Sequence, residues 1–211
     1  MGDKITLYGF DGSTYVRTVR MLLADKSAEY EQVPINVLEG EPRGSEHLAR
    51  HPFGKVPVVD VDGIRIRETD AICRYLDETL EGPSLIPDSP KDRARMNEAI
   101  CLINSYGYNA LVGVAGYHLF PEFIGGADDE ARKHCLGESE KLLKLLIENK
   151  NGDPWLAGAN PSLADYFLAP ICFYVSLTPD ADTVFAVDGT GDWWKRMQDV
   201  DSFKPTEPDL G

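Results

Sequence analysis

Three short stretches in the first third of the chain carry residue types suited to recognising a peptide-like ligand. The stretch GSTY, residues 12–15, places Ser13 directly before a helical apolar pattern. A hydroxyl at the start of a helix most often caps that helix, but it can also donate to a bound anion. A serine nucleophile is not expected, because no histidine or other base neighbours Ser13 and the G-x-S-x-G pattern is absent.

The second stretch is FGKVPVVDVDG, residues 53–63, in which Pro57 precedes an apolar run. Proline cannot donate to a strand ladder, so the predicted strand must begin at Pro57 or lie at an edge. The commoner interpretation is a trans proline at the start of an edge strand. The alternative is a Val56-Pro57 turn that offers the backbone of Val56 to an extended ligand, as in β-augmentation.

The third stretch is RETDAI, residues 67–72, where a hairpin ends and a helix opens. Free N–H groups at a helix start favour a carboxylate, and the Thr69 hydroxyl adds a donor. Glu68 can accept from an ammonium group, so the pair suits an α-amino acid head group. The alternative is that Thr69 is a plain N-cap.

These stretches need elements to position them, and the pattern predicts the order β-α-β-α-β-β-α within residues 1–81. Asp62-Gly63 predicts a tight hairpin. The proline-rich segment 82–90 is the predicted linker. Beyond it, residues 91–211 show no convincing strand, and Ser162 with Asp165 forms a capping box. Strands are predicted over 4–9, 30–37, 58–60 and 64–67, and the longer helices over 68–81, 91–119, 128–149, 162–177 and 192–200.

Composition narrows the classes of partner. The 211 residues carry a formal net charge of −14, which disfavours nucleic acid and anionic membranes. No apolar segment suits a signal peptide or a membrane span, so a soluble, unexported protein is expected. The four cysteines have no metal-ligand spacing, so they are predicted to be reduced core residues and no metal site is expected. His47 and His134 are predicted to be solvated.

The pieces LYGFDGSTYVRTVRMLL, HPFGKVPVVDVDG, RETDAI, LIPDSP and NPSLADYFLAP, in this order and spacing, resemble the glutathione transferase family. The resemblance covers nearly the whole chain. It is nearest to the phi and zeta patterns, which have a serine-type active site, and it suggests a bacterial-type member of the family. It implies an α/β thioredoxin-like N-terminal domain followed by an all-α C-terminal domain. Glutathione would be the co-substrate, with no metal. Tyr15 stands where zeta enzymes carry cysteine, which weakens a maleylacetoacetate isomerase assignment.

The resemblance also implies roles for particular residues. Ser13 would stabilise the glutathione thiolate, with Thr14 and Tyr8 as alternatives. In the family the Val-Pro peptide is cis, which gives Val56 the pairing with glutathione's cysteine and Pro57 the task of fixing its geometry. The remaining candidates are Glu68 and Thr69 for the γ-glutamyl end, and Arg43, Lys55 and, as a further possibility, His51 for the glycine carboxylate.

A hydrophobic electrophile is expected to meet aromatic residues of the second domain, with Tyr106, Tyr108 and Tyr117 as candidates, although such aromatics often only fill a core. Small residues between them permit the close approach of a ligand or a partner helix. The resemblance implies a cytoplasmic homodimer active in detoxification, with Phe53 as a candidate dimer contact. The alternatives are a glutathione-dependent isomerase or dehalogenase, and a non-catalytic binding or assembly protein of the same fold.

Overall fold

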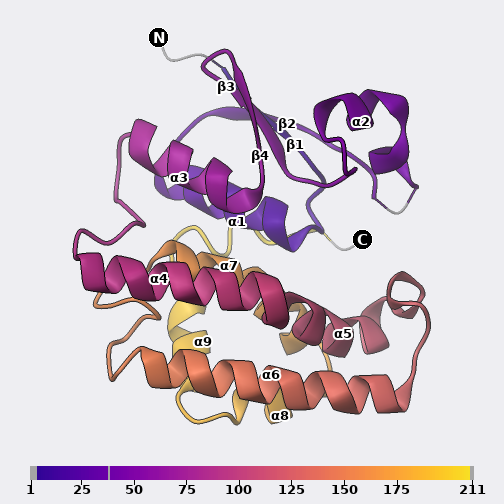
Figure 1. Cartoon of the computed structure of the whole chain (residues 1–211), viewed down its shortest axis with the longest axis vertical. Coiled ribbons are helices and arrows are strands. Elements are labelled where there is room, and N and C mark those ends of the chain that lie inside the picture. The colour runs from indigo at the N-terminus through magenta and orange to yellow at the C-terminus, as the bar shows by residue number, and fades with distance from the viewer. Residues whose placement is uncertain (1–3, 38, 210–211) are drawn as a thin grey trace. The chain divides into compact units, whose positions relative to one another are not determined.

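The computed structural model describes residues 4–37 and 39–209. Contacts along the chain divide it into two compact units (Figure 1). The first comprises the residues up to Ser84 together with those from Val200 onward, and the second is Leu85–Asp199. Among the helices of these described residues, none is long and apolar enough to cross a membrane.

The first unit is a four-stranded sheet with strand order β2-β1-β3-β4, in which β1 and β2 are parallel and the other pairs antiparallel. The predicted element order is confirmed, and it is that of a thioredoxin-like domain. Figure 1 shows α1 and α3 side by side along the sheet. The elements are β1 (Ile5–Tyr8), α1 (Thr14–Asp25), β2 (Tyr30–Val33), the 3₁₀ turn η1 (Glu41–Arg43), α2 (Ser45–Arg50), β3 (Val58–Val61), β4 (Ile64–Arg67) and α3 (Thr69–Thr79).

Local sequence explains most of these boundaries. Strand β2 ends at Val33, earlier than predicted, because Pro34 has no N–H for the ladder. Asp62 and Gly63 both have positive φ, at 49° and 73°, as a tight two-residue hairpin turn requires. Helix α1 buries Val16 and its apolar neighbours completely, and it packs against α3.

A buried ion pair ties the far ends of these two helices together. Lys26 Nζ lies 2.9 Å from Asp77 Oδ1, and both side chains are almost completely buried. Lys26 also donates to the backbone carbonyl of Asp77, and Ser84 donates to the Asp77 carboxylate. Each charge of the pair is therefore matched by a partner and by a further hydrogen bond.

The second unit is helical, and its first predicted helix is interrupted. A π-helical turn, η2 (Ile103–Gly107), separates α4 (Pro90–Leu102) from α5 (Tyr108–Leu119), where the sequence predicted one helix over 91–119. The remaining elements are the 3₁₀ turn η3 (Pro121–Ile124), α6 (Asp129–Asn149), α7 (Leu163–Ser176), α8 (Ala181–Phe185) and α9 (Thr190–Gln198), of which η3 and α8 were not predicted. π-turns of this kind are often found near functional sites.

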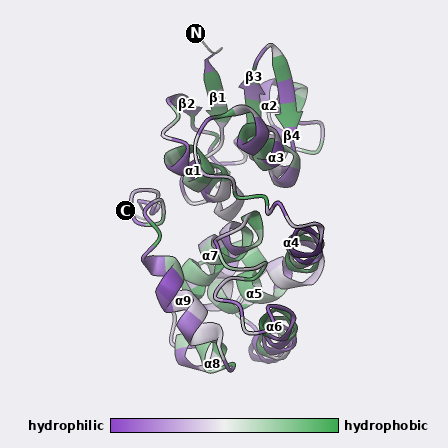
Figure 2. Ribbon diagram, turned by 90° about the vertical axis from the view of Figure 1, so that its left-hand side faces the viewer, coloured by the Kyte–Doolittle hydropathy of each residue, from purple (hydrophilic) through white to green (hydrophobic). Residues whose placement is uncertain are grey.

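Helix α7 is the buried centre of this unit, as predicted, and Figure 2 shows it coloured hydrophobic among the other helices. Its capping box is present, with Ser162 at the N-cap. The Asp165 carboxylate is fully buried and accepts from the backbone N–H groups of Leu156 and Ser162, the Ser162 hydroxyl and the indole of Trp193. Burial raises the pKa of Asp165, while these four donors lower it.

The C-terminal segment packs with the first unit, and the burial of the cysteines differs in part from the expectation. The C-terminal segment groups with the first unit: Arg17 on α1 donates to the carbonyl of Phe203 at 2.9 Å, and its guanidinium lies 4.3 Å from that ring's centroid. Phe203 and Thr206 are buried, so both side chains of this segment pack into the first unit. Of the four free cysteines, Cys73 and Cys172 are buried as expected, whereas Cys135 is half-buried and Cys101 is exposed.

Candidate active site

Strand register brings the three chemistry-bearing stretches to one end of the sheet. Tyr8, the last residue of β1, pairs with Val58, the first residue of β3, and Val58 pairs in turn with Arg67, the last residue of β4. The chain segments that continue past these three positions therefore leave the sheet side by side. They are residues 9–13, the Val56-Pro57 peptide and Glu68-Thr69.

The loop before α1 is fixed by its own contacts. A side chain on Gly9 would place its Cβ 2.4 Å from the Val16 side chain, so only glycine fits there. Gln32 on β2 donates to Gly9 O and to Asp11 Oδ1, which anchors the loop to the sheet. These contacts fix the position of Ser13 at the start of α1.

Ser13 is the N-cap of α1. Its backbone is extended, and its Oγ accepts from the backbone N–H of Val16 at 3.4 Å. A serine hydroxyl that accepts one hydrogen bond still has its own O–H to donate. Ser13 therefore caps the helix through its oxygen, as the sequence suggested. Its hydroxyl proton can still be donated to an anion at the helix N-terminus.

The two alternatives to Ser13 have different surroundings. The Tyr8 hydroxyl donates to Asp60 Oδ2 at 3.1 Å, and the Arg50 guanidinium lies 4.6 Å from the Tyr8 ring centroid. Tyr8 therefore already has an acceptor on the neighbouring strand. Thr14 is buried, and its Oγ1 has no hydrogen-bond partner among the described residues.

The Val56-Pro57 peptide bond is cis. Pro57 is buried and Val56 is half-buried just before β3 begins. Within the described part of the chain, no hydrogen bond engages the backbone N–H or C=O of Val56, whereas the carbonyl of Lys55 accepts from His47 at 2.8 Å. Val56 thus presents unpaired backbone groups at the end of the sheet, as a docking edge requires.

Glu68 precedes α3 in an unusual conformation. Its φ of 67° and ψ of 121° lie outside the regions that side chains favour, which costs on the order of 1–3 kcal/mol and is typical of ligand sites. Its side chain is 79% exposed. Thr69 is the first helical residue, and no side chain caps the helix, so the alternative of a plain Thr69 N-cap is not what forms. The first N–H groups of α3 remain open to an acceptor.

The candidates for a second carboxylate lie on the neighbouring segment. Arg43 and Lys55 are both exposed. A Cβ placed on Gly54 would lie 3.4 Å from Arg43 Cδ, so the Arg43 stem runs beside the turn that carries Lys55. Two cationic side chains therefore lie at this turn, and one of them, Lys55, immediately precedes Val56. Among the described residues, no group of three or more His, Cys, Asp or Glu side chains is placed to hold a metal ion.

The prediction that His47 is solvated is wrong: His47 and His51 are each only 2% exposed. Both hold the segment between α2 and β3, a role that sequence reasoning missed for His47. The available signal was their spacing of four residues across the end of a short helix, because residues four apart lie on the same side of a helix. His134 is exposed, as predicted.

In the second unit the three candidate tyrosines have different environments. Tyr106 lies on the π-turn and is 65% exposed, whereas Tyr108 is half-buried at the start of α5. The Tyr117 hydroxyl donates to Asp129 and the Arg132 guanidinium lies 5.2 Å from its ring centroid, so Tyr117 is tied to the start of α6. Hydrogen bonding to Asp129 raises the pKa of Tyr117.

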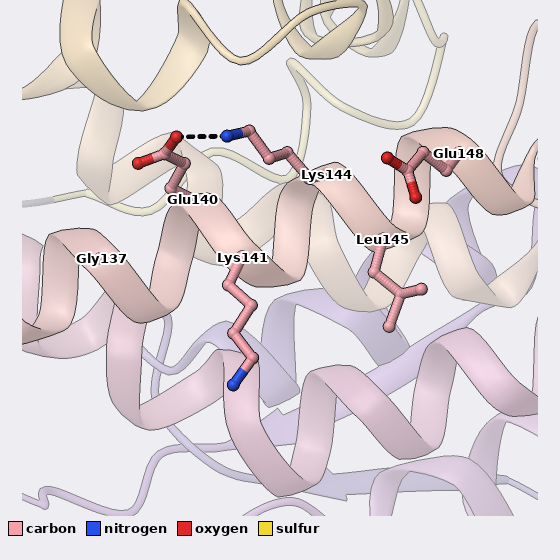
Figure 3. Close-up of a pocket in the computed structure, with 6 residues that line it drawn as sticks. All are labelled: Gly137, Glu140, Lys141, Lys144, Leu145 and Glu148. Atoms are coloured by element: carbon pink, nitrogen blue, oxygen red, sulfur yellow. Dashed lines mark hydrogen bonds and ion pairs between the residues drawn. The ribbon is translucent and has the colours of Figure 1, made fainter.

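Small residues of η2 and α5 allow helix α6 to pack closely against them. Added Cβ atoms at Gly107 and Gly113 would lie 2.4 Å from Leu142 and from Cys135 Sγ, both on α6. A hollow on the other side of α6 is lined by that helix alone, with an ion pair between Glu140 and Lys144 (Figure 3). It contains none of the candidate residues and is an ordinary solvated helix face.

Comparison with known proteins matches both units. The family models described as Glutathione S-transferase, N-terminal domain and C-terminal domain match residues 3–78 and 109–198. The chain is 29% identical to a maleylacetoacetate isomerase of Rhizobium meliloti (strain 1021), over 99% of this chain and 98% of that protein. It is 32% identical to Glutathione S-transferase Z1 of Arabidopsis thaliana, over 80% and 76% of the two chains. The crystal structure of glutathione transferase F7 from Populus trichocarpa matches with a TM-score of 0.86 at 25% identity, over 96% and 97% of the two chains.

Proposed function

The chain belongs to the glutathione S-transferase family, and we propose that it uses Ser13 to activate glutathione for attack on a hydrophobic electrophile. It is a glutathione transferase, the activity that the matched domains and relatives support. The thiolate sulfur forms a bond to an electrophilic carbon. In substitution the leaving group departs with its electron pair, and in addition a proton from solvent completes the product.

Each part of glutathione has a complementary group at the end of the sheet. The unpaired backbone of Val56, held by Pro57, suits the cysteine residue of the peptide. Glu68 suits the ammonium group of the ligand's γ-glutamyl end. The carboxylate of that same γ-glutamyl end suits Thr69 and the uncapped N-terminus of α3. The cationic pair Arg43 and Lys55 is proposed for the glycine carboxylate. The main support for this assignment is the strand register, which places residues 9–13, the Val56-Pro57 peptide and Glu68-Thr69 at one end of the sheet.

The energetics are sufficient without a metal. A thiol of pKa about 8.5 is only roughly 3% ionised at pH 7. Lowering that pKa by about two units needs roughly 2.7 kcal/mol of preferential interaction with the thiolate. One hydroxyl donor to a charged acceptor contributes about 1.5–3 kcal/mol, and the N-terminus of a helix about 0.3–1 kcal/mol. Ser13 at the start of α1 supplies both.

The remaining elements of the proposal concern the second substrate and the assembly. We propose that the helical unit supplies the electrophile contacts through Tyr106, Tyr108 and Tyr117. Phe53 is 74% exposed and lies in the segment between α2 and β3 that also carries Val56. Such a large, exposed apolar side chain suits a homodimer contact. A cytoplasmic location and a role in detoxification complete the proposal.

Product analysis tests the reaction. Native protein, glutathione and an activated aryl chloride should yield a thioether conjugate and chloride faster than the uncatalysed mixture. The control is Ser89→Ala, which removes a helix cap in the second unit and should leave the rate unchanged. If native protein gives no conjugate with several classes of electrophile, the transferase proposal fails.

A second candidate is a glutathione-dependent isomerase, favoured by the similarity to the Rhizobium meliloti protein along almost the whole of both chains. There the thiolate adds to an electron-poor cis alkene, the adduct rotates, and the thiolate leaves again. Such an enzyme converts the alkene to its trans isomer without consuming glutathione. Chromatography of an incubation with a cis-enedione acid distinguishes the two, since only the transferase accumulates a conjugate.

A further inference from the structure

Two buried histidines support the segment that carries Val56. His47 and His51 lie on and just after α2 and are each 2% exposed. His47 Nε2 is 2.8 Å from the carbonyl oxygen of Lys55, the residue before Val56. Because a carbonyl only accepts, His47 donates here and carries a proton on Nε2. The segment is thus anchored from one side next to its docking edge.

The contacts of His51 define its protonation state. The backbone N–H of Phe53 points at His51 Nδ1, 3.3 Å away, so Nδ1 must be an acceptor. The proton of the neutral ring is then on Nε2, which lies 3.6 Å from Glu68 Oε1. One ring therefore links the turn at Phe53 to the carboxylate proposed for the γ-glutamyl ammonium.

We propose that neutral His51 is a positioning residue of the glutathione site, and that its protonation weakens glutathione binding. This rests on the proposed function. A proton on Nδ1 would face the Phe53 N–H, so the two donors would repel and the turn leading to Val56 would shift. The same proton would make His51 an imidazolium cation beside Glu68. That cation would compete with the ammonium of the ligand for the Glu68 carboxylate.

The charges around His51 act in both directions. Glu68, at the start of α3, favours the imidazolium, whereas Arg67 at the end of β4 and His47 on α2 oppose it. Burial is the largest influence and lowers the pKa of His51 below 6.5. The unfolded chain therefore takes up this proton at higher pH than the native protein. The stability contributed by neutral His51 is complete above pH 6.5 and is lost as the pH falls through the lowered pKa.

Calorimetric titration with S-methylglutathione tests the proposal, because the blocked thiol removes thiolate ionisation from the measurement. Between pH 7.0 and 5.5 the ligand's carboxylates stay ionised. Native protein should lose affinity as the pH falls toward the lowered pKa of His51, and the loss reached at pH 5.5 should be less than about tenfold because that pKa lies below 6.5. His51→Asn keeps an acceptor near Nδ1 but cannot titrate, so its affinity should stay within about threefold of native at pH 7.0 and change little with pH.

Two further variants separate positioning from general damage. His51→Leu leaves the Phe53 N–H unpaired and should bind about fivefold more weakly at both pH values. With unblocked glutathione, the KM should rise while kcat changes less than twofold, because Ser13 is untouched. His134→Asn, the same change at an exposed position in the second unit, should reproduce the native pH profile.

The outcomes are distinguishable. If native protein and His51→Asn lose affinity in parallel between pH 7.0 and 5.5, the role of His51 is refuted while the glutathione site stands. If native protein binds S-methylglutathione at neither pH, the proposed function fails and this inference fails with it. Should His51→Asn not fold, His51→Gln replaces it, since its amide also cannot titrate in this range.

Discussion

Replacing Ser13 by alanine should cost more thiolate stabilisation than folding free energy. The hydroxyl has two separable roles, because Oγ accepts from Val16 N–H at 3.4 Å while its own proton is available to the thiolate. Loss of the cap costs about 0.5–2 kcal/mol of folding free energy, and the long bond points to the lower end. Loss of a donor to a charged acceptor costs about 1.5–3 kcal/mol of thiolate stabilisation.

These magnitudes predict a clear shift. At 1.36 kcal/mol for each pKa unit, the apparent pKa of the bound thiol should rise by roughly one to two units in Ser13→Ala. At a pH near the native pKa, kcat/KM should then fall roughly five- to fiftyfold, as the thiolate fraction does. Ultraviolet absorbance of the thiolate, followed against pH at saturating glutathione, measures the pKa directly.

A matched control isolates the second role. Ser89 caps α4 in the second unit with the same geometry, its Oγ accepting from Asp92 N–H at 3.4 Å. Ser89→Ala should therefore cost similar stability in thermal unfolding and leave the thiolate pKa unchanged. Ser13→Thr keeps a hydroxyl and should recover most of the native pKa. The reasoning is refuted if Ser13→Ala retains the native thiolate pKa, in which case Thr14 or Tyr8 inherits the role.

Two other perturbations have defined outcomes. Glu68→Gln removes the charge proposed for the ligand ammonium. Because that side chain is largely exposed, glutathione should bind only about two- to tenfold more weakly, with little change in kcat. The control Glu78→Gln, at an exposed position on α3, should not change glutathione binding. Equal losses of affinity for the two variants in titration calorimetry would contradict the assignment. Lys26→Met removes the cation that faces the buried Asp77 carboxylate and should cost about 3–5 kcal/mol of unfolding free energy. The double variant Lys26→Met/Asp77→Leu should recover most of that loss in denaturant unfolding, and no recovery would show that the pair itself is stabilising.

Sequence predicted the features that depend on neighbouring residues. The Asp62-Gly63 hairpin and the Ser162 capping box form because their signals lie within four residues of one another. Family resemblance anticipated a cis Val56-Pro57 peptide, which local pattern alone disfavoured.

Features that depend on distant partners were missed or misread. His47 is buried only because the chain returns over it and places the Lys55 carbonyl against its ring. Phe203 is buried because Arg17, 186 residues earlier, holds its carbonyl. Gly107, in the unpredicted π-turn, packs closely against Leu142 on another helix. No local pattern reports such partners.

Proton release on glutathione binding tests the central claim most directly. Calorimetric titration of native protein at pH 7.5, in two buffers of different ionisation enthalpy, counts the protons that leave the complex. If the site lowers the thiol pKa from about 8.5 to about 6.5, binding should release about 0.8 proton per site. Binding without proton release would contradict activation of the thiol, and no binding at all would contradict the site itself.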